Sequence, residues 1–338
     1  MLNIAINGFG RIGRTLVRSL LTRTDSSPKL NIVAINCGPD DPARLAHLLA
    51  YDTTMGPWQE KVSYQNGVLH CGSTRIQLLS ELNPAQCDWG TYQIDWVLEA
   101  SGRFTSKQAA SAHITAGARK VLICAPGNDV DRTIVFGINH ETFDPTTDTI
   151  ISLASCTTNC LAPIIEVLRS SCGIVEGMMT SVHAYTSDQR LLDNDHKDLR
   201  RARAAAQNII PTKTGASKAI TALYPELKDK IHGIALRVPT HNVSLVDFSF
   251  TMKHPARAAE INAALKQASV GSLQGVLAYT ELPLVSNDFM QHSASSIADG
   301  LLTATTGSTA KVCAWYDNEF GYCQRIIDFL LHNNANLG

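Results

Sequence analysis

The amino-acid sequence predicts an α/β protein of two domains, in which a doubly wound parallel sheet is followed by a mainly antiparallel sheet. Three observations lead to this prediction. The chain has 338 residues, more than one typical hydrophobic core supports. Short apolar strands alternate with helical stretches in the first half, whereas longer extended runs dominate the second half. The change of pattern places the domain boundary within residues 149–155.

The first half shows the alternation of strand and helix that is typical of a doubly wound parallel sheet. Its expected strands are residues 3–6, 30–35, 95–99 and 120–124, and its expected helices are residues 11–21 and 106–116. We therefore assign residues 1–154 to a first domain.

The second half differs, because its extended runs are longer and one of them alternates between apolar and polar residues. The extended runs are residues 174–183, 232–238, 243–252 and 311–315, and the expected helices are residues 258–268 and 322–331. The alternation over residues 246–250 is expected of a sheet with one face in water. We assign residues 155–318 to an α+β second domain, and we expect a C-terminal helix within residues 319–338 to pack back on the first domain.

The bulk composition, with 44% hydrophobic and 17% charged residues, is that of an ordinary soluble enzyme. The net charge of −1 gives no electrostatic support for binding nucleic acid or an anionic membrane. No apolar run approaches the roughly 20 residues that span a bilayer, and we expect no secretory signal. Nine cysteines form no regular framework, so we expect reduced thiols and a cytoplasmic location. We also expect no metal site.

A glycine-rich turn follows the first expected strand and opens the first expected helix. This turn, Gly8-Phe9-Gly10-Arg11-Ile12-Gly13, matches the G-x-G-x-x-G pattern of Rossmann-like dinucleotide-binding domains. Small residues let the backbone approach a pyrophosphate, and the helix N-terminus offers amide donors. The alternative is a turn whose glycines serve packing only. The carboxylate expected at the end of the second strand is missing, since residues 34–38 are Ala-Ile-Asn-Cys-Gly.

A cysteine lies where another strand is followed by a helix. Cys156 stands between an expected strand at residues 150–154 and a helical stretch at residues 161–169. A thiol at a helix N-terminus lies in a positive field, which favours the thiolate. The alternative is a buried structural cysteine, which the polar neighbours of Cys156 argue against. Cys160 lies one helical turn further along and is expected to point inward.

Two further segments supply groups that a nucleophilic thiol could use. His183 ends an extended run and opens a polar segment, so it is a candidate base, although a lone histidine is more often structural. Arginines within residues 198–203 and the hydroxyl and glycine residues of 211–215 suit phosphate oxygens. The alternative for the arginines is a solvated helix face or a subunit contact.

Eight collinear segments together carry a family resemblance. They are residues 6–14, 154–160, 183–186, 198–201, 208–211, 214–216, 237–240 and 315–319. The most specific is Ala154-Ser155-Cys156-Thr157-Thr158-Asn159-Cys160. With these segments the chain resembles the phosphorylating glyceraldehyde-3-phosphate dehydrogenases over nearly its whole length.

The resemblance implies a two-stage reaction on glyceraldehyde 3-phosphate that gives 1,3-bisphosphoglycerate. Cys156 would attack the aldehyde, and His183 would take the proton and steady the oxyanion. A hydride would pass to NAD or NADP, whose carboxamide Asn318 would hold. Inorganic phosphate would then attack the cysteine thioester. Covalent catalysis of this kind divides one difficult step into two easier ones.

The resemblance also implies binding residues and partners. Around the substrate's own phosphate it places Thr186, Asp188 and Arg237. For the attacking phosphate it implies Ser155, Thr157, Arg201, Thr214 and Gly215. For the cofactor it implies Gly8, Gly10, Arg11, Ile12, Gly13, Cys37, Cys124 and Asn318. The segment from residue 183 to about 210 would reach across a subunit interface, which implies a cytoplasmic homotetramer.

The sequence departs from the family pattern at several positions. Cys37 stands where NAD-preferring members usually carry Asp, and Asn194-Asp195 where many carry Leu-Pro. Lys213 replaces a more usual Ser or Thr, and Leu82 lies where relatives often carry Arg. Because Cys37 neither binds a ribose hydroxyl well nor repels a 2′-phosphate, we expect the chain to use both NAD and NADP.

Two alternative functions remain at this point. Residues 279–286 look similar to erythrose-4-phosphate dehydrogenases, whereas Tyr185-Thr186 and residues 214–216 follow the triose-phosphate pattern. A non-catalytic cofactor-binding protein would be marked by loss of Cys156, His183 or Arg237, and all three are present. The near-neutral charge gives no support for a secondary role in binding RNA.

Overall fold

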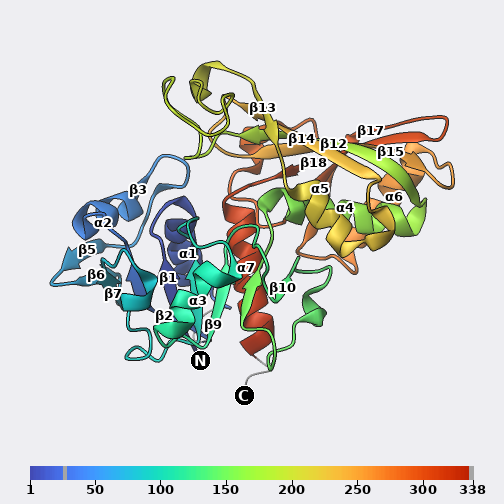
Figure 1. Ribbon diagram of the computed structural model, residues 1–338. Helices are drawn as coiled ribbons and strands as arrows, with labels where there is room; N and C mark the ends of the chain where they lie inside the picture. The colour runs from blue at the N-terminus through green and yellow to red at the C-terminus, as the bar shows by residue number, and fades with distance from the viewer. Residues whose placement is uncertain (26–28, 335–338) are drawn as a thin grey trace. The chain divides into compact units, whose positions relative to one another are not determined.

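Two β-sheets, each with its own helices, organise the residues that the computed structural model describes, which are 1–25 and 29–334 (Figure 1). The first unit comprises residues 1–136 and 140–154 together with the C-terminal stretch from residue 323. The second unit comprises residues 137–139 and 155–322.

Within the described residues, the first unit contains a nine-stranded sheet in the order β10-β11-β9-β8-β1-β2-β7-β6-β5. All neighbours from β10 to β7 are parallel, and β5, β6 and β7 form an antiparallel edge. The strands are β1 (Leu2–Asn7), β2 (Leu30–Asn36), β5 (Val62–Gln65), β6 (Val68–Cys71), β7 (Thr74–Leu79), β8 (Trp96–Glu99), β9 (Lys120–Ile123), β10 (Arg132–Thr133) and β11 (Ile150–Ser152). The parallel part confirms the predicted doubly wound, Rossmann-like sheet.

The central strands are apolar because both faces of the sheet are covered. All four residues of β8 are buried, as are five of the six in β1, which is typical of a parallel sheet between two layers of helices. The helices of this unit are α1 (Arg11–Thr22), α2 (Pro42–Ala50), α3 (Lys107–Thr115) and most of α7 (Phe320–Asn334), with the short 3₁₀ turns η1 (Pro84–Gln86) and η2 (His140–Thr142). Side-chain caps start α2 and α3, since Asp41 accepts from the amide of Ala43 and Ser106 from that of Ala109.

The antiparallel edge and α2 are absent from the sequence-based prediction. β5 and β6 are joined at Asn66-Gly67, where both residues have positive φ, 51° and 80°. Asn-Gly is the strongest local signal for a tight hairpin, because both residues adopt positive φ at low cost. This signal was available in the sequence. A further two-stranded ribbon pairs β3 (Tyr51–Asp52) with β4 (Gly56–Pro57).

The C-terminal part of α7 packs on the first unit. Gln324 Nε2 donates to Ser19 Oγ at 3.1 Å, and Arg23 pairs with Asp328 at 2.7 Å. The ring of Phe329 meets that of Trp96 edge-on at 5.9 Å. The sequence-based prediction extended this segment to residue 338, and residues 335–338 lie outside the described residues.

In the described residues of the second unit, a seven-stranded sheet has the order β13-β14-β12-β15-β18-β17-β16. Its strands are β12 (Ile174–Ala184), β13 (Ile210–Lys213), β14 (Ile231–Val238), β15 (Ser244–Met252), β16 (Leu277–Thr280), β17 (Ser296–Thr306) and β18 (Thr309–Tyr316). The pairs β12–β14 and β16–β17 are parallel and the other four are antiparallel. This confirms the predicted mainly antiparallel sheet.

Burial within β15 alternates strictly between buried and half-buried residues, as the apolar pattern predicted. The helices of this unit are α4 (Cys156–Ser171), α5 (Ala216–Leu223) and α6 (Ala258–Val270), with 3₁₀ turns η3 (Ala205–Gln207), η4 (Pro225–Leu227) and η5 (Ser286–Phe289). α4 begins five residues before the predicted start at 161, because Ser155 caps it by accepting from the amide of Thr158. Across the described residues, no helix is both long and apolar enough to cross a bilayer.

Candidate active site

The turn between β1 and α1 has a backbone that only glycine permits at two positions. Gly8 has a φ of +100°, and a Cβ added there would lie 2.5 Å from the amide nitrogen of Ser101. A Cβ added at Gly13 would lie 2.1 Å from the carbonyl oxygen of Gly8. Gly10 differs, since a Cβ there would meet no described atom within 4 Å. The tight turn therefore presents bare backbone at the start of α1, which suits a pyrophosphate.

A cavity lies at the carboxyl ends of β1 and β2, where a Rossmann-like sheet binds its ligand. Its lining includes Gly8, Phe9, Gly10, Asn36, Cys37, Asp40, Leu82 and Arg103. Burial raises the pKa of the Cys37 thiol to about 12, and the charge of Asp40 adds to this effect. Cys37 is therefore a neutral group in this cavity. Arg103, which the sequence analysis did not single out, brings a cation to the same lining.

A buried carboxylate supports the turn from the neighbouring strand. Glu99, at the end of β8, accepts from Asn7 Nδ2 at 2.6 Å and from the amide of Ser101 at 2.8 Å. His113 Nδ1 accepts from Trp89 Nε1 at 3.1 Å, so the proton of that ring lies on Nε2, 3.0 Å from Glu99. These contacts hold the ends of β1 and β8 together beside Gly8.

The remaining predicted cofactor residues have varied surroundings. The Arg11 guanidinium forms an ion pair with Asp52, so any contact from this residue to a pyrophosphate comes from its amide. Ile12 is the second residue of α1 and half-buried. Cys124 is buried, with its Sγ 3.8 Å from the carbonyl oxygen of Leu122, and it does not line the cavity described above.

The thiol of Cys156 lies at the first residue of α4, beside an imidazole. Its Sγ is 3.6 Å from His183 Nε2. Ala154, two residues earlier, has a φ of +55°, so the chain turns sharply before the helix. Burial raises the pKa of the Cys156 thiol, although the charge of Arg237 acts to lower it. The N-terminus of α4 favours ionisation of this half-buried thiol, and burial opposes it.

Strand register brings His183 and Arg237 together. They are paired positions on the parallel strands β12 and β14. His183 Nδ1 lies 2.6 Å from the carbonyl oxygen of Ala184 and 2.8 Å from Arg237 Nη1. Burial, followed by the charge of Arg237, lowers the pKa of His183 to about 3. The imidazole is therefore neutral at neutral pH and able to accept a proton.

Two hydroxyl groups that sequence reasoning missed hold this centre in place. Tyr316 Oη bonds to Thr157 Oγ1 at 3.0 Å and to Ser181 Oγ at 2.9 Å, and its ring meets the His183 ring edge-on at 6.0 Å. Ser244 Oγ accepts from the amide of Ala184 at 3.1 Å and donates to Asn318 Oδ1 at 2.8 Å. The Asn318 oxygen is thereby fixed as an acceptor.

The arginine-rich segment is a set of turns and contains no α-helix among its described residues. Arg201 forms an ion pair with Asp188, and its Nε donates to Thr212 Oγ1 at 2.9 Å. Burial acts to raise the pKa of Asp188, but hydrogen bonds from Arg201 and His196 outweigh it and lower that pKa. Asp188 is therefore an anion that orients Arg201.

The other predicted phosphate residues lie at turns and helix starts. Thr186 donates from its amide to Gln189 Oε1 at 2.8 Å. Thr214 Oγ1 accepts from the amide of Ala216 at 3.2 Å, and Gly215 is the N-cap of α5. Among the buried polar atoms of the described residues, Arg237 Nε and Gln189 Nε2 have no hydrogen-bond partner. A buried guanidinium donor without a partner indicates a place for an anion.

Comparison with known proteins gives this geometry its context. The family model for the NAD binding domain of glyceraldehyde 3-phosphate dehydrogenase matches residues 2–107, and the model for the C-terminal domain matches residues 155–318. Glyceraldehyde-3-phosphate dehydrogenase 2 of Trichormus variabilis is 51% identical over 331 residues, with 97% of each chain covered. The enzymes of Geobacillus stearothermophilus and Bacillus subtilis (dehydrogenase 1) are 49% and 48% identical, with 96% of each chain covered.

The chain belongs to the glyceraldehyde-3-phosphate dehydrogenase family. It is an oxidoreductase with glyceraldehyde-3-phosphate dehydrogenase activity, a reaction of glycolysis, and not the non-catalytic binding protein considered above. The resemblance drawn from the sequence motifs is therefore confirmed.

Proposed function

We propose that this dehydrogenase oxidises glyceraldehyde 3-phosphate through a thioester on Cys156 and releases 1,3-bisphosphoglycerate. The observation that carries the proposal is the contact of Cys156 Sγ with His183 Nε2, at 3.6 Å, with Arg237 on the other ring nitrogen. The thiol and the base are within reach of one another, and a cation stands beside them.

The contacts of His183 favour the tautomer that the reaction needs. A carbonyl oxygen only accepts, so an Nδ1 proton bonded to Ala184 leaves the Nε2 lone pair facing the Cys156 thiol. His183 then takes the thiol proton while the sulfur–carbon bond forms, and the aldehyde oxygen becomes an oxyanion. The ring then carries a proton on each nitrogen, and the Nε2 proton faces that oxyanion.

Arg237 would bind the substrate's own phosphate together with Thr186, with Asp188 positioning the neighbouring Arg201. The partnerless Nε of Arg237 supports this role. Because the charge of Arg237 lowers the pKa of His183, an anion bound to the guanidinium would offset that charge and make His183 a stronger base. A substrate phosphate would thus improve proton transfer as well as affinity.

The second phosphate, which attacks the thioester carbon and displaces the Cys156 thiolate, would bind to hydroxyl, amide and guanidinium donors. The proposed donors are Ser155, Thr157, Arg201, Thr214 and Gly215. Gly215 supports this because a Cβ there would meet no described atom within 4 Å, so the start of α5 is open. Arg201 is held by Asp188 and Thr212, which supports a preorganised cation.

The residues of the first unit fit a dinucleotide, since a Cβ at Gly8 or Gly13 would fill the turn that the pyrophosphate needs. A bound nicotinamide would supply the acceptor for the hydride that leaves the substrate carbon. Gly8, Gly10, Arg11, Ile12 and Gly13 would hold the pyrophosphate. Asn318 would donate from its amide nitrogen to the carboxamide, because its oxygen already accepts from Ser244. We retain Cys124 as a cofactor contact on the resemblance alone.

We propose that the chain uses both NAD and NADP. Cys37 is neutral, so the ribose end of the cavity lacks the carboxylate that would repel a 2′-phosphate at that position. Arg103 supplies a cation to the cavity, and Asp40 a partly opposing charge. The test is kcat/KM for both cofactors in the wild type and in Cys37→Asp, which should lose NADP activity selectively. Strict NAD preference in the wild type would disprove dual use.

The oligomeric state and location are proposals as well. Large apolar side chains in the segment after His183 lie in water in the single chain, with Leu191 81% and Leu199 82% exposed. Exposed large apolar side chains of this kind are common where subunits meet, which supports the homotetramer that the resemblance implies. Light scattering after size exclusion measures this directly. A catalytic thiol needs a reducing compartment, so we propose the cytoplasm.

The substrate assignment is tested by initial rates on glyceraldehyde 3-phosphate and erythrose 4-phosphate, each with and without inorganic phosphate. We expect the triose phosphate to be the better substrate and turnover to require phosphate. In the segment that resembles erythrose-4-phosphate dehydrogenases, Tyr279 Oη donates to Glu281, two residues along the chain, at 2.8 Å. This local contact does not support erythrose 4-phosphate as the substrate. Faster turnover of erythrose 4-phosphate would overturn the assignment.

A further inference from the structure

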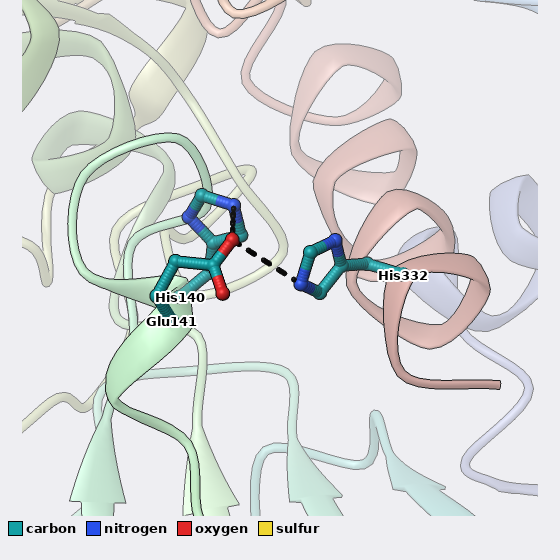
Figure 2. Close-up of side chains that lie close together, drawn as sticks. All are labelled: His140, Glu141 and His332. Carbon is teal, nitrogen blue, oxygen red and sulfur yellow. Dashed lines mark ion pairs between the residues drawn. The ribbon is translucent and has the colours of Figure 1, made fainter. Parts of the chain in front are cut away.

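The first unit contains two histidines and a glutamate that the proposed function does not use. His140 and Glu141 belong to the short turn η2, and His332 lies in the last turn of α7. Figure 2 shows the three side chains pointing toward one another, two from the turn and one from the helix. About 190 residues of chain separate the turn from His332, so only the fold brings them together.

The two nitrogen–oxygen separations in this cluster match a metal site better than a pair of hydrogen bonds. Glu141 Oε1 lies 3.4 Å from His140 Nε2 and 3.4 Å from His332 Nε2. Hydrogen bonds from nitrogen to oxygen are usually about 2.7–3.2 Å long. A zinc ion that holds nitrogen and oxygen ligands at about 2.0–2.1 Å in a tetrahedron sets them about 3.3–3.4 Å apart. One ligand atom from each residue lies within 4.8 Å of the other two.

Aromatic packing orients both imidazoles. The Phe136 ring packs on the His140 ring at 4.4 Å and meets the His332 ring edge-on at 6.1 Å. The two imidazoles lie 4.9 Å apart at 68°, so they do not stack face to face. Rings held in this way converge on a common point at little further cost in side-chain entropy.

We propose that His140, Glu141 and His332 bind a divalent transition-metal ion of the zinc type. Two imidazole nitrogens and a carboxylate oxygen are a donor set that zinc accepts with water in the fourth position. Glu141 is 74% exposed, and His332 is 33% exposed, so an ion and its water can enter from solvent. The bound ion joins the turn η2 to the end of α7, and since it binds the folded state it stabilises the first unit.

The test is a Zn²⁺ and Co²⁺ titration of the full chain after iodoacetamide has blocked Cys156, so that the reactive thiol cannot bind the ion. We expect one ion per chain, a visible Co²⁺ spectrum of tetrahedral type without sulfur charge-transfer bands, and a higher Tm with Zn²⁺. His140→Ala and His332→Ala should each weaken metal binding by at least about 10–100-fold. Losing a residue that only hydrogen-bonds to a metal ligand already has an effect of this size. The matched control is His254→Ala, which removes an exposed histidine outside the cluster and should bind as the wild type does.

Two further variants protect the test from misfolding. Glu141→Gln and His332→Gln keep side-chain size and should lose affinity while dehydrogenase activity in metal-free buffer stays normal. Wild-type affinity in all four cluster variants would overturn the proposal, as would equal loss in the His254→Ala control. A wild type that binds no Zn²⁺ at micromolar concentration would overturn it too, and would identify the cluster as a set of ion pairs. The affinity, spectrum and Tm readouts do not depend on the proposed catalytic roles.

Discussion

The glycine-rich turn of the first unit and the thiol centre of the second depend on different parts of the chain. The turn depends on its backbone conformation, which Gly8 and Gly13 permit because they have no side chains. At the thiol centre, Cys156, His183 and Arg237 come from three segments that α4 and strand register bring together. Substitutions at the two places should therefore have different effects. Changes at the centre should reduce turnover, and changes at the turn should reduce stability and cofactor affinity.

The strongest expected effect is at the thiol. Cys156→Ser should abolish acyl phosphate formation while cofactor binding survives, because a serine hydroxyl ionises far less readily than a thiol. The measurements are phosphate-dependent turnover and cofactor titration by fluorescence. Cys160→Ser is the matched control, since Cys160 lies one turn along the same helix, is fully buried and should tolerate the change. Turnover by the Cys156→Ser variant would show that Cys156 is not the nucleophile.

The next largest effect is expected at the base. His183→Asn should slow acylation about 10²–10⁴-fold, the typical value of a positioned acid–base group. Stopped-flow measurement of the first turnover separates this step from product release. An unchanged first turnover would leave His183 a purely structural role.

The same variant tests the low pKa of His183 through acid stability. The folded pKa, about 3, lies below the ordinary value of 6.5, so the unfolded chain binds the extra proton between these pH values. Stability contributed by the neutral ring is therefore fully present above pH 6.5 and declines as pH falls toward 3. Urea midpoints at pH 7 and pH 4.5 should fall more in the wild type than in His183→Asn. Equal falls would contradict the lowered pKa.

A smaller effect is expected at Arg237. Arg237→Leu should lower kcat/KM about 10–150-fold for glyceraldehyde 3-phosphate, the equivalent of one charge-assisted hydrogen bond of roughly 1.5–3 kcal/mol. Unphosphorylated glyceraldehyde should lose less, although it should lose some activity because Arg237 also contacts His183. Arg237→Lys, which keeps the charge, should recover part of the difference. Equal losses of kcat/KM for both aldehydes would show that Arg237 does not bind the substrate phosphate.

The smallest effect on the chemical step is expected at the turn. Gly13→Ala should destabilise the first unit by about 1–3 kcal/mol and weaken cofactor binding, because its methyl group would overlap the carbonyl oxygen of Gly8. Gly10→Ala is the matched control for stability in the same turn, where the methyl group meets open space. Thermal unfolding compares the stability of the two variants, and cofactor titration measures affinity in each. Equal stability of the two variants would show that the turn relaxes around the methyl group.

The sequence predicted most of what depends on short, contiguous patterns. The alternating strands and helices, the turn from Gly8 to Gly13 and the cysteine at the start of α4 each occupy one stretch of chain. The Asn66-Gly67 hairpin was equally readable and was missed. What the residues alone could not give was pairing between distant segments, since nothing near His183 indicates that register places Arg237 beside it.

The pKa values of buried groups could not be predicted from the sequence either. Position at a helix N-terminus suggested a readily ionised Cys156, but the depth of burial, which raises its pKa, exists only in the folded chain. Tyr316 and Ser244 were missed because hydroxyl groups are common and only their bonds mark them. The same holds for His332, whose partners at residues 140 and 141 no spacing rule connects to it.

The double contact of Arg237 constrains how this chain can evolve. The guanidinium lies against the ring of His183 and also presents a buried donor without a partner. If Arg237 binds the substrate phosphate as proposed, a mutation at this position that relaxes the preference for phosphorylated aldehydes also disturbs His183, the proposed base. In that mechanism, a change of substrate by this route needs a second change that restores the contact with Nδ1.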